Sequence, residues 1–133
     1  MKLETERTII KYPSKNDLEK FIEMSSDEEI ARHIYNSRIP ISKERLEQIF
    51  NSCMEVNGDN NDLIFFAGIY SKKSIDVLIG IIIHQETHGA DSMLLSGLKY
   101  ELVFGLEKRS RRRGIMTEVI SAVTDYMKSI KIK

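Results

Sequence analysis

The stretch from Tyr100 to Glu118 holds the residues whose types and spacing are best suited to chemistry. An apolar, aromatic run from 100 to 106 is followed by a short segment rich in Lys and Arg, and Gly114 then precedes a run with helical periodicity. This pattern predicts a strand, a basic loop and a helix N-terminus. Such a turn exposes unpaired backbone N–H groups at the positive end of a helix dipole, which suits an anion. Gly114 removes a side chain where a phosphate would approach the backbone. We therefore interpret the segment as a phosphate-binding loop.

Helices and one strand are predicted before this segment. Residues 5–12 predict a first strand, because Thr, Ile and Tyr recur there before a proline. Capping patterns at Ser14, Ser26 and Ser42 then predict the starts of three helices, each with an apolar stripe. The third helix is expected to end at the dipeptide 57–58, Asn-Gly.

Strands dominate the second half of the predicted order. Residues 63–70 and 75–83 read as two strands, and the second is apolar almost throughout, as in a strand covered on both faces. Residues 88–91 predict a loop and 93–106 a long strand. A final helix begins at Gly114, with an inward stripe at Ile115, Met116, Val119, Ile120, Val123 and Met127. Residues 130–133 alternate like the start of a further strand.

This order predicts one α+β (mixed α/β layered) domain over residues 1–133. The chain has 20 basic and 20 acidic residues, so its formal net charge is zero, which disfavours a nucleic-acid partner. Cys53 has no second cysteine to pair with and is expected in the core. The charged start has no apolar signal-peptide region, and the longest apolar run is far short of the ~20 residues of a membrane span. We expect a cytoplasmic protein with no membrane partner.

The basic loop resembles a known signature. Residues 111–116, Arg-Arg-Arg-Gly-Ile-Met, are similar to the pyrophosphate-binding motif of the GNAT acetyltransferase superfamily, Gln/Arg-x-x-Gly-x-Gly/Ala. A Met in the last position, followed by Thr117 and Glu118, resembles the branch that acetylates ribosomal-protein N-termini and related amines. Segments 4–10, 26–31 and 100–106 resemble the first strand, second helix and fourth strand of that branch. The resemblance implies the GNAT acyl-CoA N-acyltransferase fold, with acetyl-CoA as co-substrate.

The sequence departs from the family pattern in two places. Arg112 stands where the motif usually has Gly. Family members also continue beyond the position of Lys133 through a strand, a helix and a hairpin, and the pantetheine arm lies between the fourth strand and that fifth strand. The expected fold therefore lacks the C-terminal strand-helix-hairpin. An uncovered fourth strand predicts association with a second copy, as a homodimer.

The resemblance also implies roles for particular residues. The backbone of Phe104, Gly105 and Leu106 would pair with the pantetheine and polarise the thioester carbonyl. Main-chain N–H groups would hold the pyrophosphate along Arg111, Arg112, Arg113, Gly114, Ile115, Met116 and Thr117. Lys108, Arg109 or Arg112 would lie near the 3′-phosphate. The alternatives for this basic run are a solvated loop and a contact with RNA phosphates.

Glu101 is the candidate general base, because the attacking amine must lose a proton and a carboxylate on this strand could reach it. The alternative is a Glu paired with a nearby Lys or Arg. His84 and His88 could line the acceptor site or be ordinary strand-end histidines. No His, Asp or Glu spacing suits a metal, so no metal is predicted.

Two functions remain open from the sequence. The first is an acetyl-CoA-dependent N-acetyltransferase that acts on a primary amine, either a protein N-terminus or a small amine or amino-acid-like molecule. The second is a non-catalytic or degenerate acyl-CoA-binding domain.

Overall fold

The computed structural model describes residues 1–35, 41–57, 64–86 and 100–131. The elements in chain order are β1 (Lys2–Glu4), β2 (Thr8–Lys11), the 3-10 helix η1 (Lys15–Asp17), α1 (Leu18–Ser25), α2 (Glu28–Tyr35), α3 (Lys43–Asn57), β3 (Phe65–Ser71), β4 (Ser74–Glu86), β5 (Tyr100–Leu106), the 3-10 helix η2 (Lys108–Ser110) and α5 (Ile115–Lys131).

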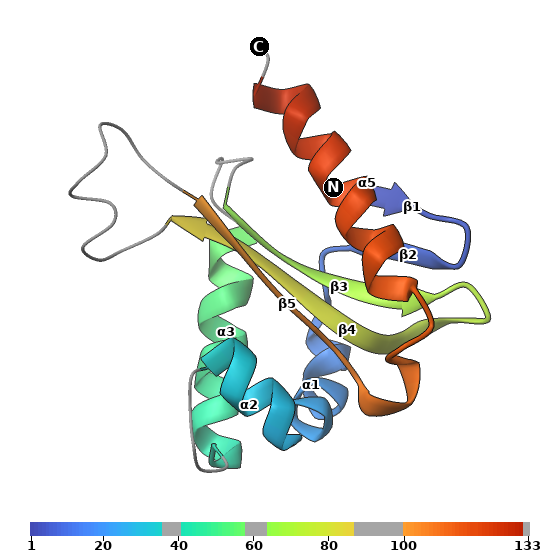
Figure 1. The fold of residues 1–133 in the computed structure, drawn as a ribbon. Coiled ribbons are helices and arrows are strands. Elements are labelled where there is room, and N and C mark those ends of the chain that lie inside the picture. Colours follow the sequence, from blue (N-terminus) through green and yellow to red (C-terminus); the bar gives the residue numbers. More distant parts are fainter. Residues whose placement is uncertain (36–40, 58–63, 87–99, 132–133) are drawn as a thin grey trace.

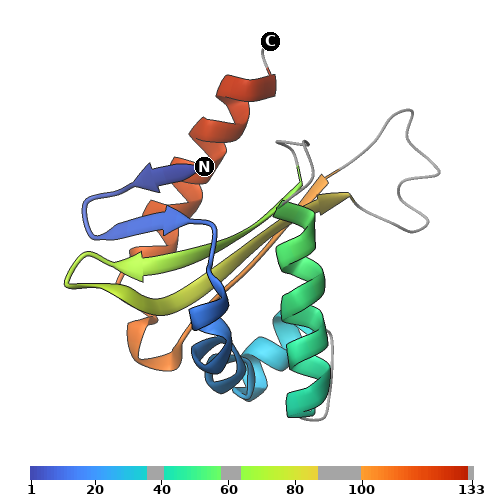
Figure 2. The same ribbon diagram turned by 180° about the vertical axis from the view of Figure 1, so that it is seen from behind.

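The five strands form one antiparallel sheet in the order β1-β2-β3-β4-β5. Helices α1, α2 and α3 cover one face, and α5 crosses the other face (Figures 1 and 2). This arrangement confirms the predicted α+β class. In the described part of the chain β5 pairs only with β4, so its other edge faces no strand.

Side chains that alternate along the central strands build two cores, one on each face of the sheet. Phe65, Ala67 and Ile69 pack with α5 residues such as Val119 and Val123. Residues of opposite phase, including Phe66 and Tyr70, pack with α1, α2 and α3. The prediction of a strand covered on both faces is confirmed for β4, because Leu78 and Ile81 lie in one core while Ile79 and Ile82 lie in the other.

Two of the three predicted helix caps are correct. Asp17 Oδ2 accepts the Ser14 N–H at 2.9 Å, and Ser42 Oγ accepts the Arg45 N–H at 3.1 Å. The prediction of Ser26 as a cap is wrong, since its hydroxyl donates back to the Ile22 carbonyl at 2.9 Å. Asp27 caps α2 instead, because its Oδ1 accepts the N–H groups two and three residues later, at 2.8 and 3.4 Å.

The predicted first strand is two strands joined by a turn. Thr5 Oγ1 accepts the Thr8 N–H at 3.0 Å, and the Thr5 N–H donates to the Thr8 carbonyl at 3.0 Å. These local bonds satisfy the backbone in a turn, so residues 5–7 leave the sheet between β1 and β2. Arg7 consequently sits at the tip of a hairpin.

The last predicted strand is also wrong as far as the structure describes it. Ile130 and Lys131 continue α5, because Ile130 packs against the α5-side core in the helical phase of Met127. The predicted loop at 88–91 and the first part of the long strand, 93–99, lie outside the described residues.

Cys53 packs against the core under α1 and α3, as predicted, and burial raises the pKa of its thiol to about 11. It is therefore a neutral core group rather than a nucleophile. No helix in the described ranges is both long and apolar enough to cross a membrane.

Candidate functional site

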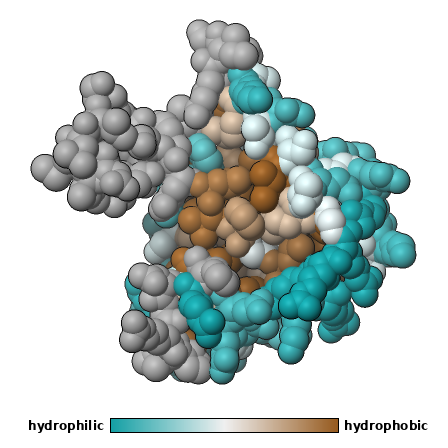
Figure 3. All heavy atoms as spheres, viewed as in Figure 1, coloured by the Kyte–Doolittle hydropathy of each residue, from teal (hydrophilic) through white to brown (hydrophobic). Residues whose placement is uncertain are grey.

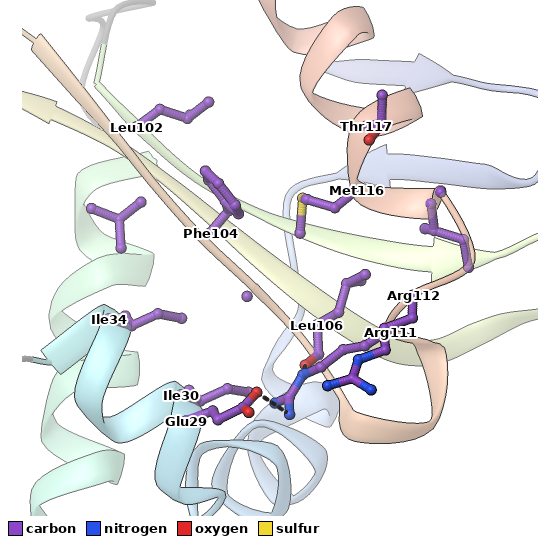
Figure 4. A pocket seen from close by; sticks show the side chains of 14 residues that line it. Glu29, Ile30, Ile34, Leu102, Phe104, Leu106, Arg111, Arg112, Met116 and Thr117 are labelled. Atoms are coloured by element: carbon purple, nitrogen blue, oxygen red, sulfur yellow. Dashed lines mark hydrogen bonds and ion pairs between the residues drawn. The ribbon is translucent and has the colours of Figure 1, made fainter.

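An open cleft of about 720 Å³ runs along the free edge of β5. Its walls are β5, helix α2 and the loop that leads into α5 (Figure 4). Apolar surface gathers at the centre of this face of the molecule (Figure 3). The lining residues are Glu29, Ile30, Ile34, Leu102, Val103, Phe104, Gly105, Leu106, Arg111, Arg112, Gly114, Ile115, Met116 and Thr117.

The register of β5 decides which backbone groups face this cleft. The N–H of Glu107, one residue after β5, donates to the Ile79 carbonyl of β4 at 2.7 Å. In an antiparallel ladder, hydrogen-bonded and non-hydrogen-bonded pairs alternate. Gly105 shares the phase of Glu107 and so turns its N–H and C=O towards β4. Leu106 and Phe104 have the other phase and present their backbone groups at the open edge.

Phe104 is also an exposed aromatic residue. The residue keeps 40% of its surface accessible, although it sits in the middle of β5. Fully burying an aromatic side chain of this size contributes about 2 kcal/mol or more, so the exposed part of Phe104 leaves some of that contribution unused. An exposed aromatic side chain beside unpaired strand groups indicates a surface that takes a partner or ligand.

The loop between β5 and α5 turns sharply at two residues with left-handed backbone. Arg112 has φ of 64° and Gly114 has φ of 77°. Glycine adopts this conformation freely, whereas an L side chain is strained there, which explains why the motif favours Gly at the position of Arg112. The Glu118 N–H makes the first bond of α5, to the Gly114 carbonyl at 3.2 Å. Residues 115–117 precede that bond, so the helix itself offers their N–H groups no acceptor.

The side chain of Arg111 is already engaged by the protein. Its Nε donates to the Leu106 carbonyl at 2.9 Å, Nη1 to Glu29 Oε2 at 2.7 Å and Nη2 to Asp27 Oδ1 at 3.1 Å. Burial alone would raise the pKa of Asp27, but the Arg111 bond and the Glu29 N–H together lower it below its ordinary value. Arg111 therefore ties the loop to α2 and to β5 rather than offering its charge to a ligand.

Nine of the ten predicted cofactor residues line the cleft, and Arg113 is the exception. The Arg113 carbonyl accepts a hydrogen bond from Arg7 Nη1 at 2.7 Å. The cofactor role of all ten stays a prediction, although the backbone N–H and C=O of Gly105 face β4 and so do not lie at the open edge as expected. Of the basic residues predicted near a 3′-phosphate, Arg112 lines this cleft, while Lys108 and Arg109 line a separate hollow of about 320 Å³.

Glu101 lies on β5 opposite Gln85, but its side chain is outside what the structure describes, so its role as the base stays a prediction. His84 is buried, with its ring stacked on Phe65 at a centroid distance of 5.5 Å, which places it in the α5-side core. His88 lies outside the described residues. Within the described ranges, no group of three His, Cys, Asp or Glu residues could hold a metal ion.

Helix α2 forms a wall of the cleft, because Ile30 and Ile34 on its apolar face both line it. The sequence predicted that this helix has an apolar stripe but not that the stripe borders a cleft. Gly105 explains the close approach of α2, since a Cβ there would lie 2.7 Å from Ile34 Cδ1. The side-chain spacing within α2 reveals an apolar face but not which strand that face meets.

One comparison with known proteins identifies the family. A family model described as an acetyltransferase (GNAT) domain matches residues 7–132. A search of curated proteins finds no match to this sequence.

Solved structures share the fold at low sequence identity. A GNAT-family acetyltransferase from Bacillus anthracis superposes with a TM-score of 0.71 at 20% identity, and the match covers 98% of this chain and 69% of that one. An acetyltransferase from Agrobacterium tumefaciens str. C58 has a TM-score of 0.68 at 17% identity, over 95% of this chain and 66% of that one. A protein from Vibrio cholerae, proposed to be a ribosomal-protein-serine acetyltransferase, has a TM-score of 0.57 at 13% identity, over 93% and 64% of the two chains.

These findings agree with the antiparallel sheet and its covering helices. Members of this family transfer an acyl group from an acyl-CoA to an acceptor. From its match over residues 7–132, the chain belongs to the GNAT acetyltransferase superfamily.

Proposed function

We propose that this protein transfers the acetyl group of acetyl-CoA to a primary amine by direct attack of the amine on the thioester. The acceptor is a protein N-terminus or a small amine or amino-acid-like molecule. One observation supports the proposal most: the outward backbone groups of β5 and the unpaired N–H groups at the start of α5 face one cleft.

The edge of β5 would bind the pantetheine arm. Phe104 presents an N–H and a C=O, and Leu106 presents an N–H, because its carbonyl already accepts Arg111 Nε. A pantetheine amide could pair with these groups as another strand would. An outward N–H beside the thioester carbonyl would stabilise the negative charge that develops on its oxygen. Gly105 contributes a flat surface rather than hydrogen bonds, since its backbone groups face β4.

The start of α5 would hold the pyrophosphate. The loop turns at Gly114, and the N–H groups of residues 114–117 lie at the positive end of a 17-residue helix. The Arg112 side chain is exposed at the cleft and supplies a positive charge. Glu101 would accept the proton of the attacking amine, directly or through a water, while the thiolate of CoA departs.

Titration calorimetry with CoA tests the cofactor assignment. We expect binding to the native chain, and weaker binding of dephospho-CoA if a basic side chain contacts the 3′-phosphate. The absence of heat at millimolar CoA would contradict the assignment. Acetylation of a panel of primary amines then tests catalysis.

The open side of the cleft favours a second candidate, an acyl-CoA-binding domain without catalysis. Beside the free edge of β5, the described residues contribute no second strand to enclose a bound thioester. CoA binding without transfer to any amine would support this second function over the first.

A further inference from the structure

Arg7 reaches the cofactor loop from the other end of the chain. It lies between β1 and β2, yet its Nη1 donates to the Arg113 carbonyl at 2.7 Å and its Nε donates to Glu118 Oε2 at 2.9 Å. Its backbone N–H also donates to Glu118 Oε1 at 2.9 Å. One arginine is thus bound to both the last part of the loop and the first turn of α5.

The bond to Arg113 sets the direction of the next N–H group. The carbonyl of Arg113 and the N–H of Gly114 belong to one planar peptide unit, and the described chain has no cis peptide. In a trans unit these two groups point in opposite directions. Gly114 lines the cleft, whereas Arg7 and Arg113 do not. A carbonyl held outward towards Arg7 therefore turns the Gly114 N–H to the cleft side.

Gly114 also lies against the guanidinium. A Cβ at Gly114 would lie 3.4 Å from Arg7 Nη2, and among the described residues no other heavy atom outside its chain neighbours comes within 4 Å of it. A Cβ at this position would thus face Arg7, so the expectation that the missing side chain of Gly114 makes room for a phosphate stays a prediction. With its φ of 77°, Gly114 therefore turns the side on which a Cβ would stand towards the guanidinium of Arg7.

We propose that Arg7 is a positioning residue for the cofactor loop: its hydrogen bond to the Arg113 carbonyl aims the Gly114 N–H at the pyrophosphate of bound CoA. This inference rests on the proposed function only for the identity of the ligand. Glu118 keeps the guanidinium in place, because its carboxylate accepts both the Nε and the backbone N–H of Arg7. A lysine keeps the charge but lacks the planar fork, so its one ammonium group cannot reproduce the separate positions of Nη1 on Arg113 and Nε on Glu118.

A ligand-free measurement tests the geometry. Accepting a hydrogen bond polarises a carbonyl and changes the ¹⁵N resonance of the amide that follows it. We expect the Gly114 amide resonance to move in Arg7→Lys. It should stay in Glu4→Gln, which breaks the Lys72–Glu4 pair of 3.5 Å near the same hairpin. An unmoved Gly114 resonance in Arg7→Lys would overturn the proposal.

A binding measurement tests the consequence. Arg7→Lys should bind CoA about tenfold more weakly than the native chain, because a misaimed N–H loses a charge-assisted hydrogen bond. Its affinity for S-acetyl-pantetheine, which lacks the pyrophosphate, should stay unchanged, and Glu4→Gln should match the native chain with both ligands. Native CoA affinity in Arg7→Lys, or equal weakening with both ligands, would refute the positioning role. A native chain that binds no CoA would refute the proposed function, and the Gly114 resonance would still decide the geometry.

Discussion

Arg111 and Glu29 meet beside the cleft, with Nη1 and Oε2 2.7 Å apart, and join the cofactor loop to helix α2. The same guanidinium holds Asp27 and the Leu106 carbonyl. The wall formed by α2 and the edge formed by β5 therefore share one arginine. Figure 4 shows this side chain between Leu106 and Glu29.

Arg111→Lys should weaken the hydrogen bonds that join the loop to α2 and to the edge of β5. A lysine keeps the charge but loses the planar fork that serves three acceptors. The side chains of Arg111 and Asp27 are 21% and 24% exposed, so screening reduces the loss to about 1 kcal/mol. Urea unfolding measures it, and CoA affinity should fall in parallel. Arg109→Lys is the control, because that side chain is 80% exposed and should change stability little. Equal stability of both variants with the native chain would contradict this reading.

Arg112→Gly should stabilise the chain slightly. A left-handed L residue costs about 1 kcal/mol, and glycine removes this strain at φ of 64°. The greater freedom of glycine in the unfolded chain offsets roughly 0.5 kcal/mol of the gain. Arg113→Gly is the matched control and should destabilise, because Arg113 has no positive φ to relieve. Chemical unfolding measures the free energy of unfolding of the two variants. The strain argument fails if Arg112→Gly is the less stable of the pair.

The Glu118 carboxylate should make stability depend on pH in the acid range. Hydrogen bonds from the Thr5 side chain, the Arg7 backbone N–H and the Arg7 side chain lower its pKa from 4.5 to about 2. A lowered pKa means that the folded state releases the proton more readily than the unfolded state. Its stabilisation is therefore complete above pH 4.5 and is lost as the pH falls towards 2.

Glu118→Gln isolates this contribution. The difference in melting temperature between the variant and the native chain should be constant above pH 4.5 and should shrink as the pH approaches 2. Calorimetric scans across this range measure it. A difference that does not change with pH would show that the charge of Glu118 is not what matters.

Glu101→Gln should slow amine acetylation at neutral pH by about 100-fold or more if Glu101 is the base. The amide cannot accept the proton of the amine, so the pH dependence of the rate should also change. CoA affinity serves as the control and should be retained. An unchanged rate and pH profile would move the role to another residue.

The free edge of β5 should promote association with a second copy of this chain. Among the described strands none pairs with this edge, and Phe104 is 40% accessible beside it; an unpaired edge and an exposed apolar surface both favour pairing between chains. We expect a homodimer in sedimentation experiments at several concentrations. A compact monomer at every concentration would argue against this use of the edge.

The sequence by itself determined the features that depend on neighbouring residues. The helical period of α5, the glycine before it and the basic loop are local features. The nearly continuous apolar run of β4, which places this strand between two cores, is local as well. Propensities and turn residues act over a few positions, which is why the α+β order and the signature loop could be read directly. The sequence patterns predicted the wrong boundaries at two places, the turn at Thr5 and the helix cap at Asp27. At both, a side chain bonds a nearby backbone N–H, and this bond competes with the predicted structure.

Only the tertiary structure decided how the cleft is assembled. Arg111 donates to Glu29, which lies 82 residues earlier in the chain, and Arg7 donates to Glu118, which lies 111 residues later. The phase of β5, which turns Phe104 outwards and Gly105 inwards, depends on its register with β4. No periodicity within a segment encodes these pairings, because they follow from how packed layers bring distant parts of the chain together.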